Sequence, residues 1–274
     1  TQSRSSAASD VYKRQVIKYR DEIVPELKSS RVHTYKLNKL LKNKICYYNL
    51  LQLNSSNVYE YKKSLQKEGL APKTININLQ MLKRIWHVAK TRWAITLPTE
   101  SPFALVSLEK VNNERDITLT DLEFKRLLEV ATKSKMHCLA DMVKFASSTA
   151  ARYSEIVGLL RQNVCFNKKT ATFMETKTTP SHTIPLHDDV VVILKKYPFG
   201  DKFFNVKSRE SFRHFWEKVR QEAGLPTFRF HDLRSFAANR MLLSGMSEIE
   251  VAAIGNWKTL AVLHRRYSRI KPAQ

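Results

Sequence analysis

Five short segments, in order along the chain, hold the residue types needed to break and rejoin a phosphodiester. They contain Arg152 with Glu155, Lys177, His231 with Arg234, Trp257, and Tyr267. Planar guanidinium groups can bind the non-bridging oxygens of a phosphorane and neutralise the charge that develops on them. A phenol can attack phosphorus, and an ammonium can protonate the oxygen that leaves. The set predicts phosphoryl transfer through a covalent intermediate, for which neither a metal ion nor another cofactor is required.

The spacing of the paired residues indicates how their side chains are presented. Arg152 opens a predicted helix, and Glu155 lies one turn further on, where its carboxylate can hold the guanidinium by a charge-assisted bond. His231 and Arg234 are three positions apart, so on one helix they project from the same face. Either pair alone is common in proteins, and the joint order of all five segments is what favours a functional site.

The remaining three residues have separate predicted settings. Residues 170–175 and 182–186 are rich in Thr and Ile and predict two strands of a hairpin, with Lys177 near its tip. A flexible ammonium delivered from there can act as a general acid. Trp257 can pack beside a phosphate and donate its indole N–H. Tyr267 follows two arginines, and neighbouring cations favour the phenolate that attacks.

Net charge predicts a large polyanion as partner. The 274 residues include 47 Lys and Arg against 25 Asp and Glu, a formal charge of +22. Residues 16–115 hold 18 basic against 8 acidic side chains, and residues 116–274 hold 26 against 16, so each part has a net charge of +10. Two basic parts favour a protein that grips one polymer with both, and nucleic acid is the first candidate.

Other features exclude several classes of protein. Cys46, Cys138 and Cys165 are odd in number and far apart, which supports neither a disulfide framework nor a zinc site. The sequence has no apolar run of membrane-spanning length and no visible signal peptide, so we expect a cytoplasmic protein.

Composition and turn signals divide the chain into four expected parts. Residues 1–15 are polar and resemble non-native or disordered sequence, and an upstream domain is not excluded. We expect a helical DNA-binding domain over residues 16–107, a linker over 108–117, where the helical periodicity breaks, and a catalytic domain over 118–274. The second domain is predicted to be mostly helical, with the hairpin as its small sheet, after a capping box at Thr120 and Glu123.

Two helices of the first domain have recognisable starts. One is expected to begin near Asn57, with Glu60 closing a capping box, and to stop at Gly69. The next begins at Pro72 and places its apolar residues on one face. Its polar side offers four candidate DNA-binding residues, namely Lys73, Thr74, Lys83 and Arg84.

Together these segments resemble the tyrosine recombinases, the phage-integrase family, over roughly residues 20–274. The resemblance is most specific at Phe230-His-Asp-Leu-Arg234, at Lys258-Thr-Leu-Ala261 and at Arg266-Tyr-Ser268, while residues 69–79 resemble the family's core-site-binding domain. It implies a mainly α protein with a small β-sheet in the C-terminal domain, in a two-domain recombinase architecture. It also implies a site-specific recombinase, most simply the integrase of a phage or other mobile element.

The resemblance assigns a role to each candidate residue. Arg152 and Arg234 would bind the scissile phosphate, with Glu155 supporting Arg152. Lys177 would protonate the departing 5′ oxygen, and Tyr267 would form a 3′-phosphotyrosyl bond. His231 would assist proton transfer at the tyrosine, and Trp257 would occupy a position filled by His or Trp in the family.

The implied partners are also those of the family. They are attachment or core sites on DNA, three further protomers in a tetramer on that DNA, and accessory DNA-bending proteins. The protein would act in a bacterial cell, in association with the nucleoid.

Two positions depart from the family pattern. Ser235 stands where a His often follows, and Trp257 and Tyr267 are ten residues apart where nine is usual. The longer spacing leaves open a DNA-binding protein of the same fold with impaired catalysis. A type IB topoisomerase-like enzyme is a second alternative, which the small helical first domain disfavours.

Overall fold

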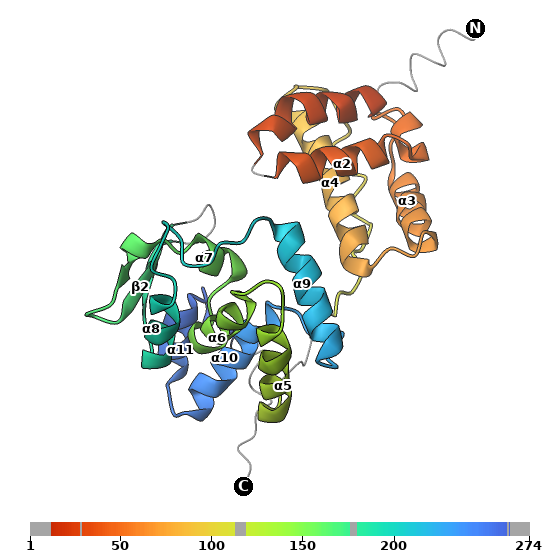
Figure 1. The fold of residues 1–274 in the computed structure, drawn as a ribbon. Coiled ribbons are helices and arrows are strands. Elements are labelled where there is room, and N and C mark those ends of the chain that lie inside the picture. The colour runs from red at the N-terminus through yellow and green to blue at the C-terminus, as the bar shows by residue number, and fades with distance from the viewer. Residues whose placement is uncertain (1–11, 28, 113–118, 176–179, 262, 264–274) are drawn as a thin grey trace, which may run out of the picture. The chain divides into compact units, whose positions relative to one another are not determined.

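A computed structural model of the chain describes residues 12–27, 29–112, 119–175, 180–261 and 263 (Figure 1). The chain divides into two compact units, Thr1–Asn113 and Glu114–Gln274. Most described residues are helical, and one small sheet lies in the second unit, as the sequence predicts. Within the described residues, no helix has the length and apolar character needed to cross a membrane.

The first unit is an assembly of helices around its own core. After a helix over residues 12–18, its elements are η1 (Tyr19–Ile23), η2 (Val24–Glu26), α2 (Ser30–Leu40), η3 (Lys44–Tyr47), α3 (Ser55–Lys67) and α4 (Pro72–Thr91). In α4, Leu79, Leu82, Trp86 and Ala89 are all buried, which confirms the predicted apolar face.

The start of the first unit differs from the expectation at residues 12–15, which the sequence grouped with residues 1–11. Residues 12–18 are helical, and Tyr12 and Val16 are fully buried in the core of the unit. Together with Tyr19 and Ile23 they recur every three or four positions, so they form one apolar stripe on consecutive helical turns. Residues 1–11 lie outside the described part of the chain.

The cap of α3 differs from the prediction by three residues. Asn54, not Asn57, is the N-cap, and the two asparagines exchange side-chain to backbone hydrogen bonds of 3.1 Å in each direction. An amide at the third helical position thus does what Glu60 was expected to do. The predicted end is confirmed, because Gly69 follows the helix with a left-handed φ of 70°.

The end of the first unit is fastened by Glu109, which the sequence assigned to the linker. Its carboxylate lies 2.8 Å from the Lys62 ammonium and accepts a 3.0 Å bond from Gln66. Its backbone exchanges two hydrogen bonds with the Asn76 side chain, of 2.8 and 2.9 Å. Lys62 also donates to the Ser107 carbonyl at 2.7 Å. The chain is therefore held to the helical unit at least as far as Glu109.

Lys62→Ala is expected to destabilise the first unit by about 2 kcal/mol, because it leaves a partly buried carboxylate and a carbonyl without their cation. Urea unfolding of the full chain, followed by circular dichroism, measures the change. The control is Lys67→Ala, which removes an exposed lysine from the same helix. Equal effects of the two variants would contradict the importance of this contact.

The second unit begins with helices and contains a short antiparallel sheet. Its elements are α5 (Asp121–Thr132), α6 (Leu139–Thr149), α7 (Tyr153–Gly158), η4 (Arg161–Asn163), β1 (Val164–Cys165), β2 (Thr170–Phe173), β3 (His182–Pro185), α8 (Asp188–Lys195), α9 (Arg209–Glu222), α10 (Asp232–Leu243) and α11 (Glu248–Gly255). The predicted capping box at the start of α5 is present, with Thr120 and Glu123 bonded in both directions. Both predicted strands form, and β1 is an additional strand of two residues.

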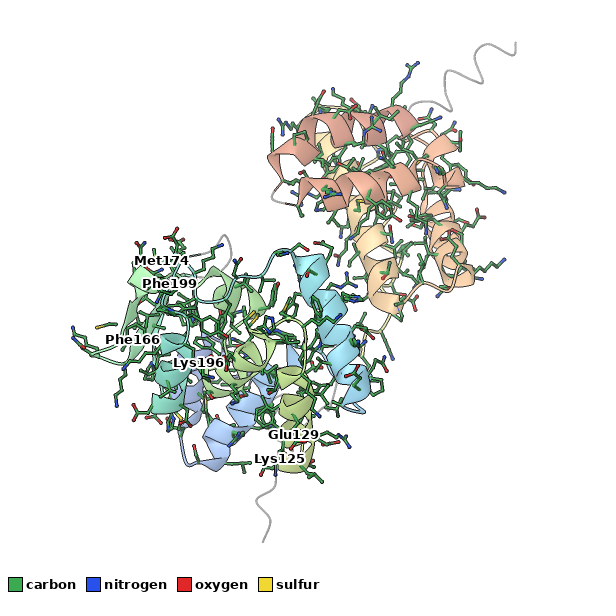
Figure 2. The ribbon with its side chains drawn as sticks, viewed as in Figure 1. Lys125, Glu129, Phe166, Met174, Lys196 and Phe199 are labelled. Atoms are coloured by element: carbon green, nitrogen blue, oxygen red, sulfur yellow. The ribbon has the colours of Figure 1, made fainter. Side chains whose placement is uncertain are left out.

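The sheet and helices of this unit share one core. In the register of β2 and β3, Phe173 lies opposite His182 as the last pair before the hairpin loop. Helix α6 is buried along most of its length and packs against α5, α8 and α10. Lys196, just after α8, pairs with Asp141 of α6 at 3.0 Å. Phe166, after β1, packs edge-on against Phe203. Figure 2 labels Lys196 and Phe166 among the side chains of this unit.

Candidate active site

Arg152 is positioned by the turn before α7 and by Glu155. It is the N-cap residue of α7, which begins at Tyr153, one residue later than predicted. The Glu155 carboxylate accepts from the backbone N–H of Arg152 at 2.7 Å and from its Nη1 at 2.6 Å. Glu155 is buried, while the Arg152 side chain remains 31% exposed. The guanidinium is therefore held by a buried carboxylate and is still accessible to a ligand from solvent. The predicted pair is therefore formed.

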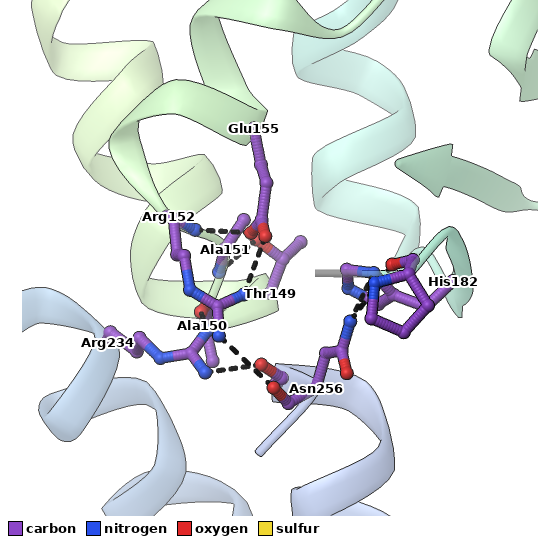
Figure 3. A network of polar contacts seen from close by, with 10 residues as sticks. Thr149, Ala150, Ala151, Arg152, Glu155, His182, Arg234 and Asn256 are labelled. Atoms are coloured by element: carbon purple, nitrogen blue, oxygen red, sulfur yellow. Dashed lines mark hydrogen bonds and ion pairs between the residues drawn. The ribbon is translucent and has the colours of Figure 1, made fainter. Parts of the chain in front are cut away.

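Arg234 lies beside Arg152 although 82 positions separate them in the sequence. It is buried in α10, and its Nη1 donates to the Ala150 carbonyl at 2.7 Å. Its Nη2 donates to the Gly255 carbonyl, and Arg152 Nη2 donates to the next carbonyl, that of Asn256, at 3.1 Å. Consecutive carbonyls at one helix end thus anchor both arginines (Figure 3).

The anchoring carbonyls come from two helix C-termini. Ala150 is the C-cap of α6 and Asn256 is the C-cap of α11, and both adopt left-handed backbone, with φ of 54° and 51°. The last carbonyls of a helix have no partner within it and carry the negative end of its dipole. Here the guanidinium groups of Arg152 and Arg234 donate to these carbonyls. Two positive charges are thereby held close together, at a place suited to bind an anion.

Trp257 is positioned against Arg234 by the absence of a side chain at Gly255. The Arg234 guanidinium carbon lies 4.0 Å from the centroid of the Trp257 ring. A Cβ on Gly255 would come within 1.8 Å of that ring, so only glycine leaves room for it. The structure therefore brings Trp257 together with Arg152, Glu155 and Arg234, as the sequence predicts.

A polar contact ties β3 to the same place. The Asn256 side chain lies 3.0 Å from His182 Nδ1 and donates to the Pro180 carbonyl at 3.4 Å. The His182 ring packs on Phe173, with centroids 5.2 Å apart. Burial lowers the pKa of His182, Glu155 raises it, and the two arginines lower it further. These opposing effects show that His182 lies within the electrostatic reach of the site.

His231 is exposed at the N-cap of α10 and borders an open pocket of about 590 Å³. The pocket is also lined by Arg209, Arg213 and Arg229, whose side chains are exposed. His231, three positions before Arg234, thus borders a group of cations that sequence reasoning did not single out. This pocket offers further contacts to a polyanion.

The remaining candidate residues lie in the first unit or outside the residues that the structure describes. Lys177 and Tyr267 are outside the described residues, so their predicted roles remain predictions. In the first unit, Lys73, Lys83 and Arg84 are exposed on α4, while Thr74 is half-buried in its first turn. Among the residues that the structure describes, no three His, Cys, Asp or Glu side chains gather closely enough to hold a metal ion.

Sequence reasoning missed Gly255, Asn256 and His182 as parts of the site. The Gly-Asn pair is a signal for a helix end and could have indicated the left-handed cap. Nothing near His182 in the sequence marks its contact, because Asn256 is 74 residues away.

Comparison with known proteins gives the geometry a context. Residues 117–274 match the model of the phage integrase family. The shufflon-specific DNA recombinase of Escherichia coli is 25% identical over 268 residues, which cover 94% of this chain and 68% of that protein. The integrase of Salmonella phage P22 is 26% identical over 215 residues, 71% of this chain and 53% of the relative.

Solved structures share the fold of the whole chain. The Tn1549 transposon integrase in complex with a circular intermediate DNA superposes with a TM-score of 0.80, 15% identity and 96% coverage of both chains. A lambda integrase tetramer bound to a Holliday junction gives 0.79 and 16%, covering 100% of this chain and 82% of that one.

Proposed function

Because the chain belongs to the phage integrase family and is a site-specific DNA recombinase of the tyrosine type, we propose that it cuts DNA through a 3′-phosphotyrosyl bond to Tyr267. The observation that carries the residue assignment is the pair Arg152 and Arg234, which share consecutive carbonyls at the end of α11. Two fixed guanidinium groups suit the non-bridging oxygens of a pentacovalent phosphorus.

The other residues take the steps that move protons. The Tyr267 oxygen attacks phosphorus and loses its proton, which His231 helps to transfer. The bond from phosphorus to the 5′ oxygen breaks, and Lys177 donates a proton to that oxygen. Glu155 holds Arg152, and Trp257 packs on Arg234. The phosphotyrosyl bond retains the energy of the broken diester, so the 5′ hydroxyl of another strand can reseal it without a nucleotide cofactor.

The proposed partner is double-stranded DNA at attachment or core sites. Both units have a net charge that suits it, and exposed Lys73, Lys83 and Arg84 on α4, with Thr74 beside them, are the proposed contacts of the first unit. A tetramer on two DNA partners follows the assembly of lambda integrase on a junction. Accessory DNA-bending proteins, a phage or mobile-element origin and action at the nucleoid of a bacterial cytoplasm complete the proposal.

The test is a covalent trap on selected DNA. Duplexes that bind the Tyr267→Phe variant are first enriched from a random-sequence library, and a nick is then placed so that the cleaved end diffuses away. We expect the wild-type protein to form a denaturation-resistant adduct whose DNA-linked peptide contains Tyr267. A linkage at another residue would refute the assignment of the nucleophile.

The alternative of a DNA-binding protein without catalysis rests on the ten-residue spacing from Trp257 to Tyr267. In that case the selected duplexes would bind tightly, and the affinity would fall steeply with salt because phosphates are contacted. No adduct would form on any nicked duplex. Relaxation of arbitrary supercoiled plasmid by monomers would instead favour the topoisomerase-like reading.

Lys177→Ala is expected to slow cleavage of ordinary DNA by at least about 100-fold, the lower end of the usual contribution of a general acid. A duplex with sulfur in place of the scissile 5′ oxygen should restore most of the rate, because a thiolate leaves without protonation. Single-turnover adduct formation measures both rates. Lys168→Ala, an exposed lysine in the turn between β1 and β2, is the control. A Lys177→Ala defect that sulfur leaves unchanged would exclude the role of acid.

A further inference from the structure

We propose that His182 and Asn256 are positioning residues of the recombination site, which fasten the start of β3 to the end of α11 only while the His182 ring is neutral. The catalytic consequence rests on the proposed function, but the link itself involves only described residues. Neither residue touches the reacting atoms in the proposed mechanism. Both act by holding the start of β3 and the end of α11 beside Arg152.

Asn256 joins three segments at one position. Its backbone carbonyl accepts from Arg152, at the start of α7, at 3.1 Å. Its side-chain Nδ2 lies 3.4 Å from the Pro180 carbonyl and 3.0 Å from His182 Nδ1, at the start of β3. The left-handed backbone of Asn256 turns the chain sharply after α11, with the carbonyl toward Arg152 and the amide toward β3 (Figure 3).

The orientation of the Asn256 side-chain amide bears on the protonation state of the His182 ring. If the Asn256 amide were reversed, its oxygen would face the Pro180 carbonyl oxygen, and neither could donate. As placed, the NH₂ group faces both Pro180 and His182. His182 Nδ1 then accepts through its lone pair, which requires a neutral ring with its proton on Nε2. Protonation of Nδ1 would break this hydrogen bond and set two donors against each other.

The surroundings of His182 also favour the neutral ring. Burial is the largest cause of its lowered pKa, and Arg152 and Arg234 add to this effect, while Glu155 and a hydrogen bond with the Pro180 backbone oppose it. Because the folded protein binds this proton less readily than the unfolded chain, the stabilisation is fully present above pH 6.5, the ordinary value. It is lost as the pH falls below 6.5 through the lowered pKa of the folded state.

The elements packed around His182 contain few other titratable groups. Strand β2 has none, and β3 has only His182 itself. Helix α11, which packs on β3, has Glu248 and Glu250 in its first turn, at the end opposite Asn256. Within the described residues, Glu155 and the two arginines are the other charged groups that act on the ring. Since His182→Asn leaves them unchanged, that variant assigns a pH dependence of the link to His182.

The link between Asn256 and the start of β3 affects the proposed reaction because this part of the chain is close in sequence to Lys177. Pro180 follows Lys177 by three residues, so the described end of the hairpin connection is fastened beside the arginine pair. Loss of the link should misplace what this connection delivers, and a displacement of about 1 Å can slow a reaction about 100-fold. We expect a cleavage defect of about 10- to 100-fold when the link is removed.

Three variants separate the hydrogen bond from packing. His182→Phe keeps a ring against Phe173 but cannot accept. His182→Asn places an oxygen near the position of Nδ1, which accepts at any pH. Asn256→Gly keeps the left-handed backbone and removes the amide.

At pH 8 the Phe and Gly variants should cleave about 10- to 100-fold more slowly than wild type, and His182→Asn should recover much of that loss. Below pH 6.5 the wild-type rate should fall relative to that of His182→Asn. Parallel pH profiles, or equal defects in the Phe and Asn variants, would overturn the proposal. The sulfur duplex that restores Lys177→Ala should also restore His182→Phe, and a defect that persists would overturn the route through the hairpin.

A measurement without DNA distinguishes this proposal from the proposed function. In protein with ¹⁵N-labelled histidine, the His182 signal, assigned by its loss in His182→Asn, should show an unprotonated Nδ1 at neutral pH. Its midpoint should lie below pH 6.5 and rise in Asn256→Gly. A protonated Nδ1, or a midpoint unchanged in Asn256→Gly, would refute the link even if the protein cleaves DNA. The expected shifts with no adduct at Tyr267 would instead refute the proposed function alone.

Discussion

Arg234→Ala is expected to slow covalent adduct formation by about 1,000-fold, the upper end of the effect of removing one donor from an anion-stabilising site. The guanidinium is one of two that face the proposed phosphate, and the surrounding protein cannot replace it. The rate is measured in single turnover on the selected nicked duplex, at a protein concentration that saturates binding.

The same substitution should also destabilise the second unit. It leaves the Ala150 and Gly255 carbonyls without the donors they have now. Unsatisfied buried acceptors cost about 1–3 kcal/mol each. Arg234→Lys should retain the charge but not both contacts, since an ammonium cannot span two carbonyls as a planar fork does.

A neutral phosphate separates the chemical effect from the structural one. A methylphosphonate at the scissile position has one non-bridging charge fewer, so Arg234→Ala should lose much less on it than on ordinary DNA. Arg240→Ala removes an exposed arginine from the same helix and is the matched control. A loss of equal size on both kinds of phosphate would show that Arg234 acts only as a structural residue.

Gly255→Ala is expected to reduce cleavage by more than about 100-fold, through displacement of the site and not through loss of any functional group. The new methyl carbon would lie 1.8 Å from the Trp257 ring, so the ring must leave its place over Arg234. The Gly255 carbonyl that holds Arg234 belongs to the residue that changes. Overpacking of this kind costs about 1–3 kcal/mol of stability.

Gly158→Ala is the matched control for that variant. Gly158 is the last residue of α7, and a Cβ there would meet no atom within 4 Å. Because alanine loses less backbone entropy in a helix, the control should be neutral or more stable by up to about 1 kcal/mol. Urea unfolding and the rate of adduct formation are measured for both variants. An active, stable Gly255→Ala protein would contradict the proposed packing.

The sequence indicated the side chains of the site better than the groups that hold them. Arg152 and Glu155 were predictable as a pair because their spacing is local, and Arg234 and Trp257 because their types suit one phosphate. The anchors of the arginines are main-chain carbonyls, which every residue has, so no residue type marks them. The contact of His182 with Asn256 spans 74 positions and depends on how β3 packs against α11.

Errors about the fold have equally local causes. Tyr12 belongs to an apolar stripe that continues through Val16, but residues 1–15 were set apart because they are mostly polar. Strand β1 has two residues, too few for an alternating pattern to be recognised. The N-cap of α3 was predicted at Asn57 instead of Asn54 because two asparagines so close together can each serve as a cap. Only the structure shows that Asn54 does.

The carbonyl anchors of Arg234 have a consequence for the binding of an anion. An arginine loses up to about 2 kcal/mol of rotamer freedom when its side chain is fixed. Here this ordering takes place during folding, so it is not repeated when a phosphate arrives. The two anchors are also dipoles without formal charge. They immobilise the guanidinium without adding a full negative charge of their own, so the anchors themselves do not cancel its attraction for an anion.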